Sequence, residues 1–182
     1  PYSEVAWHQL GRQYFVLDRF SEALTCFDYA VLIDESFIGG YLEKAKTYEQ
    51  LGNYEDSIKN YMLTLELDDP TAFAYVRIGE CYRKLGDLES AIRFYKKSVH
   101  EDPFLDKGWI LLTEAFYEQK DYQKALLQEK SIFRRNPSSL QGVINVGFRA
   151  KSDQVYDVTV DVSTCCDLLW ISHGRCAGLE VS

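Results

Sequence analysis

A repeat of 34 residues constrains the fold of this chain more than any other feature of its sequence. The stretch from Thr71 to Phe104 shows apolar residues at helical spacing, a Gly-Asp break, a second helical pattern and a closing proline. When the stretch is shifted by 34 residues in either direction, residues of the same kind coincide: Tyr82 aligns with Tyr14, Tyr48 and Phe116. A fixed period of this length with two helices per unit predicts a solenoid of stacked helical hairpins.

Four consecutive units carry this pattern, and the two helices of each unit are called helix A and helix B. In the first unit Ser3 is the expected N-cap, and helix A is predicted from about Glu4 to Leu17. Helix B is predicted from about Phe20 to Ile33. Short polar breaks connect the two helices, and acidic residues or a proline end each unit because helix B cannot continue through them. The units are residues 4–37, 38–71, 72–105 and 106–137.

One position of helix A is small in every unit, and so is one position of helix B. We expect the two helices of a hairpin to cross closely there, since larger side chains would hold them apart. Large residues such as Trp7, Tyr14 and Phe27 are expected to fill the space between hairpins. The small positions are Gly11, Ala45, Gly79 and Thr113 on helix A, and Ala23, Ser57, Ala91 and Ala125 on helix B.

These positions resemble the tetratricopeptide repeat family, whose pattern is W-x2-L-G-x2-Y followed by A-x3-F and a proline. Glu35 stands where the proline is usual in the first unit. The resemblance implies an all-α, right-handed superhelical solenoid of antiparallel helix hairpins. It also implies a non-catalytic scaffold that binds a protein or peptide and needs no cofactor. The first unit carries the pattern in Trp7, Leu10, Gly11, Tyr14, Ala23 and Phe27.

The repeat pattern weakens from Leu127 and is lost after Pro137. Residues 140–150 carry the pattern of a partial fifth helix A, and residues 156–162 alternate apolar and polar side chains as a strand does. We therefore expect residues 138–182 to be an atypical, irregular C-terminal tail. It is a small attached element, a disordered end, or a sequence foreign to the array.

Composition limits the classes of partner and the cellular location that we expect for this chain. The formal net charge is -8, and a phosphate-binding surface needs clustered Lys and Arg, so nucleic acid is not an expected partner. No run of about 18 apolar residues occurs, and no membrane span is expected. Cys26 and Cys81 fall inside predicted helices, which suits buried thiols in a reducing compartment, and a cytoplasmic location is the expectation.

By resemblance to the family, the second, fifth, ninth and twelfth residues of each unit face a concave groove lined by helix A. The second positions are Val5, Gly39, Phe73 and Lys107. An extended peptide or a helix with an apolar stripe would suit this surface. In the alternative interpretation these are solvated helix faces with local ion pairs, Arg12 with nearby acids and Glu80 with Arg83. The predicted partner-binding residues are His8, Arg12, Phe15, Leu42, Lys46, Glu49, Val76, Glu80, Arg83, Ile110, Glu114 and Tyr117.

Some family members hold the C-terminal carboxylate of chaperones in a clamp of Lys, Asn and Arg. At the corresponding positions of this chain only Arg77 matches in kind, and Glu43 would repel a carboxylate, so that ligand is disfavoured. No phosphate loop, nucleophile elbow or metalloprotease motif occurs. Residues of the tail that could ligate a metal are Cys165, Cys166, His173 and Cys176. Their spacing along the sequence fits no standard zinc site, so no metal site is predicted.

Three functions remain open at this level. The first is the peptide-binding or protein-binding scaffold just described. The second is a regulatory or docking segment of a larger enzyme or sensor whose catalytic part lies outside this chain. The third is a self-associating assembly module, in which the first or last hairpin stacks on another copy.

Overall fold

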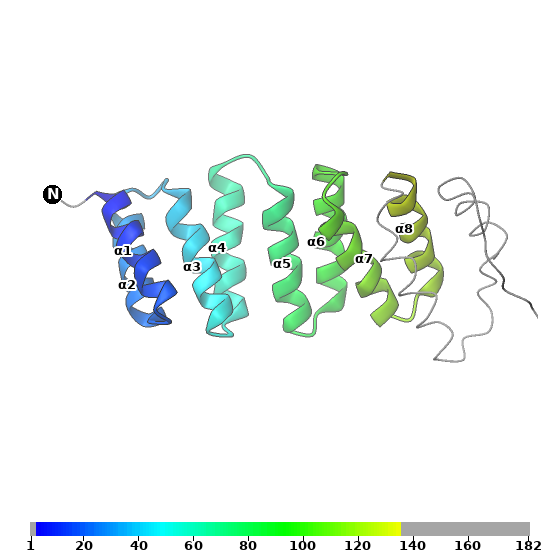
Figure 1. Ribbon diagram of the computed structural model, residues 1–182, viewed down its shortest axis with the longest axis horizontal. Coiled ribbons are helices and arrows are strands. Elements are labelled where there is room, and N and C mark those ends of the chain that lie inside the picture. The colour runs from blue at the N-terminus through cyan, green and yellow to red at the C-terminus, as the bar shows by residue number, and fades with distance from the viewer. Residues whose placement is uncertain (1–2, 136–182) are drawn as a thin grey trace, which may run out of the picture. The chain divides into compact units, whose positions relative to one another are not determined.

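The computed structural model describes residues 3–135, and all regular secondary structure among them is α-helical. The residues predicted as a fifth helix and a strand, and the cysteines of the tail, lie outside the described residues. The helices are α1 (Glu4–Val16), α2 (Phe20–Ile33), α3 (Ile38–Gln50), α4 (Tyr54–Leu67), α5 (Ala72–Lys84), α6 (Leu88–Glu101), α7 (Asp106–Glu118) and α8 (Tyr122–Arg135) (Figure 1).

The described helices alternate between helix A and helix B as the sequence predicts. Ser3 is the N-cap of α1, where its Oγ accepts a hydrogen bond from the backbone N–H of Ala6 at 3.2 Å. The bounds of α2 coincide with the predicted helix B. The chain divides after Gln128 into two units, and the packing described below belongs to the first.

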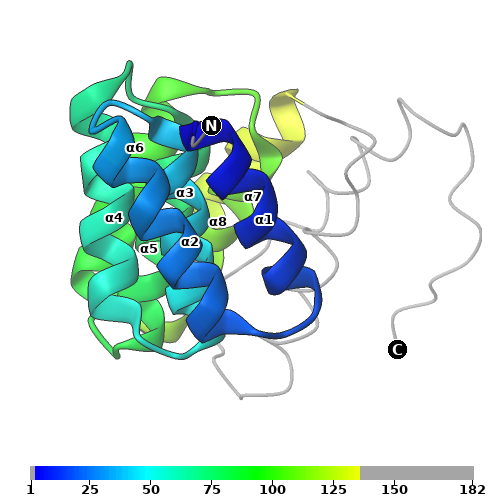
Figure 2. The same cartoon turned by 90° about the vertical axis from the view of Figure 1, so that its left-hand side faces the viewer.

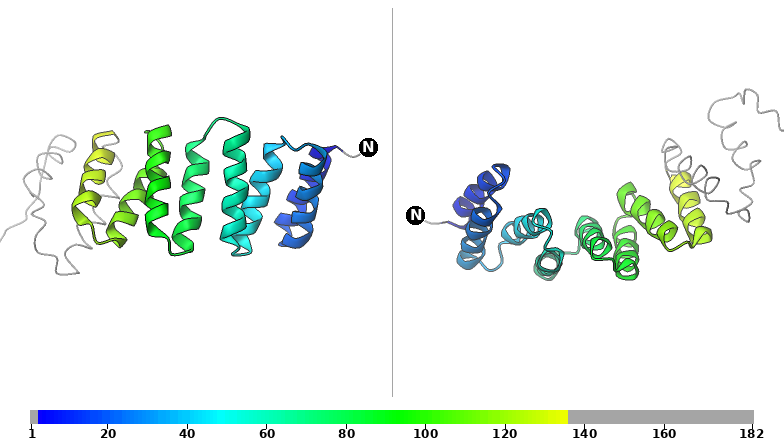
Figure 3. Two further views of the ribbon diagram at one scale, coloured as in Figure 1. Left: turned by 180° about the vertical axis from the view of Figure 1, so that it is seen from behind. Right: turned by 90° about the horizontal axis from the view of Figure 1, so that it is seen from below.

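Each helix from α1 to α6 packs against the next one along the chain, and α1 also contacts α3 as α5 contacts α7. Figures 2 and 3 show α1 and α7 on one side of this row and α4 and α6 on the other. Helices α1, α3, α5 and α7 therefore share one side of the first unit, which we call the A side. This confirms the predicted solenoid of stacked hairpins.

The predicted close crossing of the two helices in a hairpin is present. A Cβ atom added to Gly11 would lie 2.5 Å from Cε1 of Phe27, and one added to Gly79 would overlap the ring of Tyr95 in the same way. Both aromatic side chains are fully buried. Glycine lets the ring of helix B lie directly on the backbone of helix A, which fixes the spacing of the hairpin.

A second small position, at the third residue of each unit, allows neighbouring hairpins to approach. A Cβ on Gly40 would lie 2.5 Å from Cγ1 of Val31, and one on Gly108 would lie 2.7 Å from Oγ of Ser98. Both neighbours belong to helix B of the preceding hairpin. Helix A is thus held from two sides, by its own helix B and by the one before it.

The turn from helix A to helix B is the same in all four units. A residue with positive φ occupies one repeat position, with φ between 57° and 83°. The N–H of the following residue returns to the carbonyl five positions earlier, as from Asn53 to Tyr48 at 2.9 Å, which is the Schellman geometry that ends a helix. The residues with positive φ are Asp18, Gly52, Gly86 and Lys120.

The positive φ of this turn predicts that alanine changes the free energy of unfolding differently at two equivalent positions. Gly86→Ala should destabilise the fold by about 1 kcal/mol, because alanine resists positive φ. Lys120→Ala should change the free energy of unfolding by less than about 0.5 kcal/mol, because lysine, like alanine, has a Cβ atom that is strained at positive φ. Urea unfolding of the two variants checks this, and equal losses would contradict the role of the turn.

The contact between Gly79 and Tyr95 predicts that this glycine tolerates no methyl group. Gly79→Ala should cost about 1–3 kcal/mol in the free energy of unfolding, since the buried ring must shift. Gly39→Ala is the matched control in α3: its Cβ would meet the ring tip of Phe37 at 3.1 Å, and the half-buried site leaves room to adjust. A loss as large at Gly39 would show that the ring contact is not the cause.

Candidate functional site

The predicted partner-binding residues project from the four helices of the A side, but not all of them are accessible. Val76 is fully buried, so it is left out of the candidate site. His8 is half-buried between the rings of Phe27 and Phe37, with centroid distances of 6.0 Å and 5.3 Å, and this burial lowers the pKa of its imidazole. The Glu49 side chain is only 12% exposed.

The remaining positions define what we call the A face. It carries exposed apolar side chains, of which Val5, Phe73 and Ile110 are each exposed by more than 40%. These residues come from three different helices, so the apolar surface is spread along the row. The A face consists of Val5, His8, Arg12, Phe15, Gly39, Leu42, Lys46, Glu49, Phe73, Glu80, Arg83, Lys107, Ile110, Glu114 and Tyr117.

Arg77 is the centre of an ion-pair cluster beside the A face. Its guanidinium pairs with Glu49 of α3, and it donates to Oε2 of Glu80 at 2.9 Å and to the Tyr61 hydroxyl of α4 at 3.4 Å. Lys107 of α7 then reaches Oε1 of Glu80 at 3.0 Å. Four helices from three hairpins are therefore joined through one set of charges.

Burial shapes the ionisation of this cluster. Desolvation raises the pKa of the Glu49 carboxyl, and its hydrogen bond to Tyr61 and the charge of Arg77 oppose that rise. Burial also raises the pKa of the neighbouring Cys81 thiol to about 11, so this cysteine remains a protonated thiol near neutral pH. Cys26 and Cys81 are both buried, as predicted.

Arg83 joins the third hairpin to the fourth. Its Nη1 pairs with Oε2 of Glu114 at 2.9 Å, and its Nη2 pairs with Glu118, both on α7. The predicted local pair between Glu80 and Arg83 is therefore wrong. Glu80 instead binds Arg77 one turn earlier, which leaves Arg83 free to reach across to the next helix A.

Cationic residues stand at the ninth repeat position of the first two hairpins. Lys46 pairs with Glu43 at 2.9 Å, whereas Arg12 is exposed and forms no ion pair with any acid in residues 3–135. The expected local pairing of Arg12 is therefore wrong for the described part of the chain. The corresponding positions of the third and fourth hairpins hold Glu80 and Glu114, so this one repeat position changes from basic to acidic along the row.

Sequence reasoning missed the role of Arg77 and of its partner Tyr61. Arg77 occupies the sixth repeat position, where the other units have Gln9, Glu43 and Leu111. This position varies from unit to unit, so the repeat alone gives no signal for its role. Among the described residues, no group of three or more His, Cys, Asp or Glu could hold a metal ion, and none of the described helices meets the length and apolarity needed to cross a membrane.

The packing and the turns define a helical-repeat solenoid. The family model of the tetratricopeptide repeat matches residues 40–99, from α3 through α6. The matched stretch is similar to tetratricopeptide repeats, and arrays of stacked helical repeats present extended concave surfaces for binding. None of the curated proteins matches the chain in sequence.

Solved structures share the fold at low sequence identity. A crystal structure of MamA protein is 15% identical, with a TM-score of 0.74 and 98% of each chain covered. YrrB, described as a TPR protein with an unusual peptide-binding site, is 14% identical, with a TM-score of 0.67, 92% of this chain covered and 87% of its own. The first TPR of Spaghetti (RPAP3), bound to HSP90 peptide SRMEEVD, is 19% identical, with a TM-score of 0.60. The match covers 65% of this chain and 94% of that one.

The cluster around Arg77 predicts a pH-dependent loss of stability. Arg77→Leu should destabilise the fold by about 2 kcal/mol at pH 7, because the largely buried Glu49 carboxylate loses its cation. A carboxyl whose pKa is raised on folding binds its proton more tightly in the folded state, so this loss should shrink as the pH falls and Glu49 is protonated. Urea unfolding of both proteins near pH 7 and pH 5 measures it.

Arg93→Leu is the matched control, because Arg93 is exposed on α6 and contacts Ser90 and the ring of Phe94 within its own helix. It should change the free energy of unfolding by less than about 0.5 kcal/mol at either pH. A loss for Arg77→Leu that stays the same at both pH values would contradict the proposed state of Glu49.

Proposed function

We propose that this chain is a non-catalytic scaffold that binds a peptide segment of a partner protein on the A face. The observation that carries the proposal is the exposure of Phe73 and Ile110, 48% and 41%, beside charged side chains that are already ion-paired. Apolar anchors within a polar surround are the usual composition of a protein-binding surface.

The ion pairs favour a preformed surface. Arg77 connects α3 to α5, and Arg83 connects α5 to α7, so three helix-A surfaces are held together before any ligand arrives. Binding to such a surface requires little ordering of the scaffold, which lowers the entropic cost of association.

The charges of the A face suggest how a ligand lies. Arg12, which pairs with no acid among residues 3–135, would attract an acidic part of the peptide to α1. The terminal-carboxylate clamp remains disfavoured, because Glu43 stands beside Lys46 and neutralises it.

Two structural neighbours are consistent with this class of ligand. YrrB is described as having an unusual peptide-binding site, and the Spaghetti structure is bound to an HSP90 peptide. The fold alone is shared at these identities, so the ligand of this chain must be recognised by the A face itself.

Peptide selection followed by substitution tests the proposal. Peptides selected from a displayed random library on the full chain should lose about tenfold or more in affinity to the Phe73→Ala/Ile110→Ala variant, because both anchors are truncated. Leu85→Ala is the control, since Leu85 is similarly exposed, at 44%, but lies in the turn after α5. Calorimetric titration measures each affinity, and equal losses in both variants, or no loss in the double variant, would contradict binding on the A face.

A further inference from the structure

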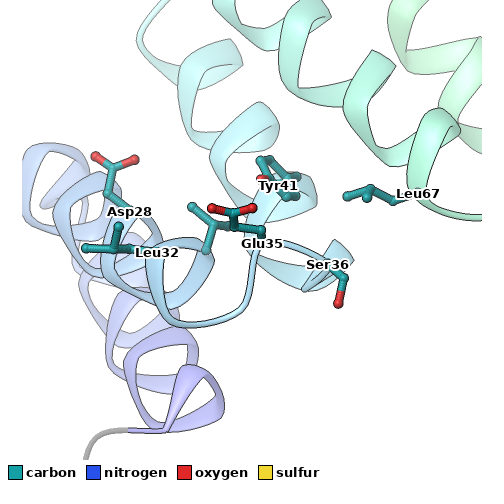
Figure 4. A pocket seen from close by; sticks show the side chains of 7 residues that line it. Asp28, Leu32, Glu35, Ser36, Tyr41 and Leu67 are labelled. Carbon is teal, nitrogen blue, oxygen red and sulfur yellow. The ribbon is translucent and has the colours of Figure 1, made fainter.

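An open hollow of about 510 Å³ lies where the first two hairpins meet, and none of its lining residues belongs to the A face. Figure 4 shows its lining: Leu32 comes from α2, Glu35 and Ser36 from the turn after it, and Tyr41 from α3, while Leu67 approaches from the end of α4. Val31 and Asp28 complete the wall. Leu32 is 73% exposed and Leu67 is 41% exposed, so the apolar part of the hollow is open to solvent.

The third hairpin shows how a tyrosine at the position of Tyr41 is covered by its own helix B. Tyr75 occupies the position of Tyr41, and its ring is covered by Phe94, at a centroid distance of 6.3 Å, and by Lys97, whose Nζ lies 5.6 Å from the ring centroid. The same positions in the second hairpin hold Asn60 and Leu63.

These shorter residues do not line the hollow. The Asn60 amide turns back and donates to the backbone carbonyl of Asp56 in its own helix at 2.7 Å, and Leu63 stays 37% exposed. The ring of Tyr41 is half-buried, with Nζ of Lys44 at 6.0 Å from its centroid, and it forms one wall of the hollow.

The charges around the hollow favour a cation. Asp28 pairs with Lys44 at 2.7 Å, whereas Glu35 forms no ion pair with any cation in residues 3–135. The exposed carboxylates of Asp68 and Asp69 follow Leu67 directly in the chain. An apolar surface with an unpaired acid at its edge is complementary to a basic segment that also carries an aliphatic side chain.

We propose that this hollow is a second interaction site, which binds a basic, leucine-containing segment of a partner protein. The aliphatic side chain lies among Leu32, Tyr41 and Leu67, and a lysine or arginine of the same segment pairs with Glu35. This site is distinct from the A face, because the two share no residue.

Fluorescence polarisation with short labelled peptides on the full chain tests the proposal. The probe contains leucine and arginine at helical spacing, one control peptide replaces arginine by glutamate, and another replaces leucine by serine. We expect only the probe to bind. Glu35→Lys should weaken its binding by about tenfold, because attraction becomes repulsion, whereas Glu101→Lys, the same exchange at the exposed end of α6, should change it by less than about twofold.

Two further variants locate the site. Leu67→Trp enlarges an exposed side chain that lines the hollow and should abolish binding by filling it, with circular dichroism confirming that the variant folds. Arg12→Glu should leave probe binding unchanged, which separates this site from the A face. Equal weakening by Glu35→Lys and Glu101→Lys, or full binding to the filled variant, would overturn the proposal, as would a molecular mass that rises with concentration only while Glu35 is present, which identifies a second copy as the occupant.

Discussion

The first and third hairpins of the array depend on the contact between a glycine of helix A and an aromatic ring of helix B. Phe27 lies on Gly11, and Tyr95 lies on Gly79, with no room for a methyl group between them. This contact sets the spacing of two helices whose turn is fixed by a residue of positive φ. Because every unit repeats the turn and the helical period, equivalent residues of α1, α3, α5 and α7 reach the same side, and one continuous surface arises from the period itself.

The sequence could predict these features because they are local and repeated. The small positions, the turns, the Ser3 cap and the bounds of α2 all follow from residue type and spacing within one unit. Ion-pair partners were less predictable, because they depend on how far a long side chain reaches toward the next hairpin. Arg83 lies three residues after Glu80, yet it binds α7, since Arg77 already holds that carboxylate. The burial of Val76 likewise depends on packing that spacing alone does not give.

Departures from the repeat give the array its individual surfaces. Arg77 occurs at its position in one unit only. It joins the second hairpin to the third through Glu49 and Tyr61, and Glu80 continues the cluster to Lys107 of the fourth. Leu32, Glu35 and Leu67 line a hollow that stays open to solvent. The shared residues therefore build the solenoid, whereas the unshared ones decide the charge, the exposed apolar area and the hollows that a partner would meet.

The most direct test of the scaffold function is the set of backbone amide chemical shifts of the isotope-labelled chain, recorded before and after addition of a peptide that it binds. A preformed A face predicts that the largest shifts fall in α1, α3, α5 and α7, and that the helices keep their hydrogen bonds. Shifts confined to residues outside 3–135, or a general change that spreads through α2, α4 and α6, would contradict a peptide-binding surface built from helix A of each repeat.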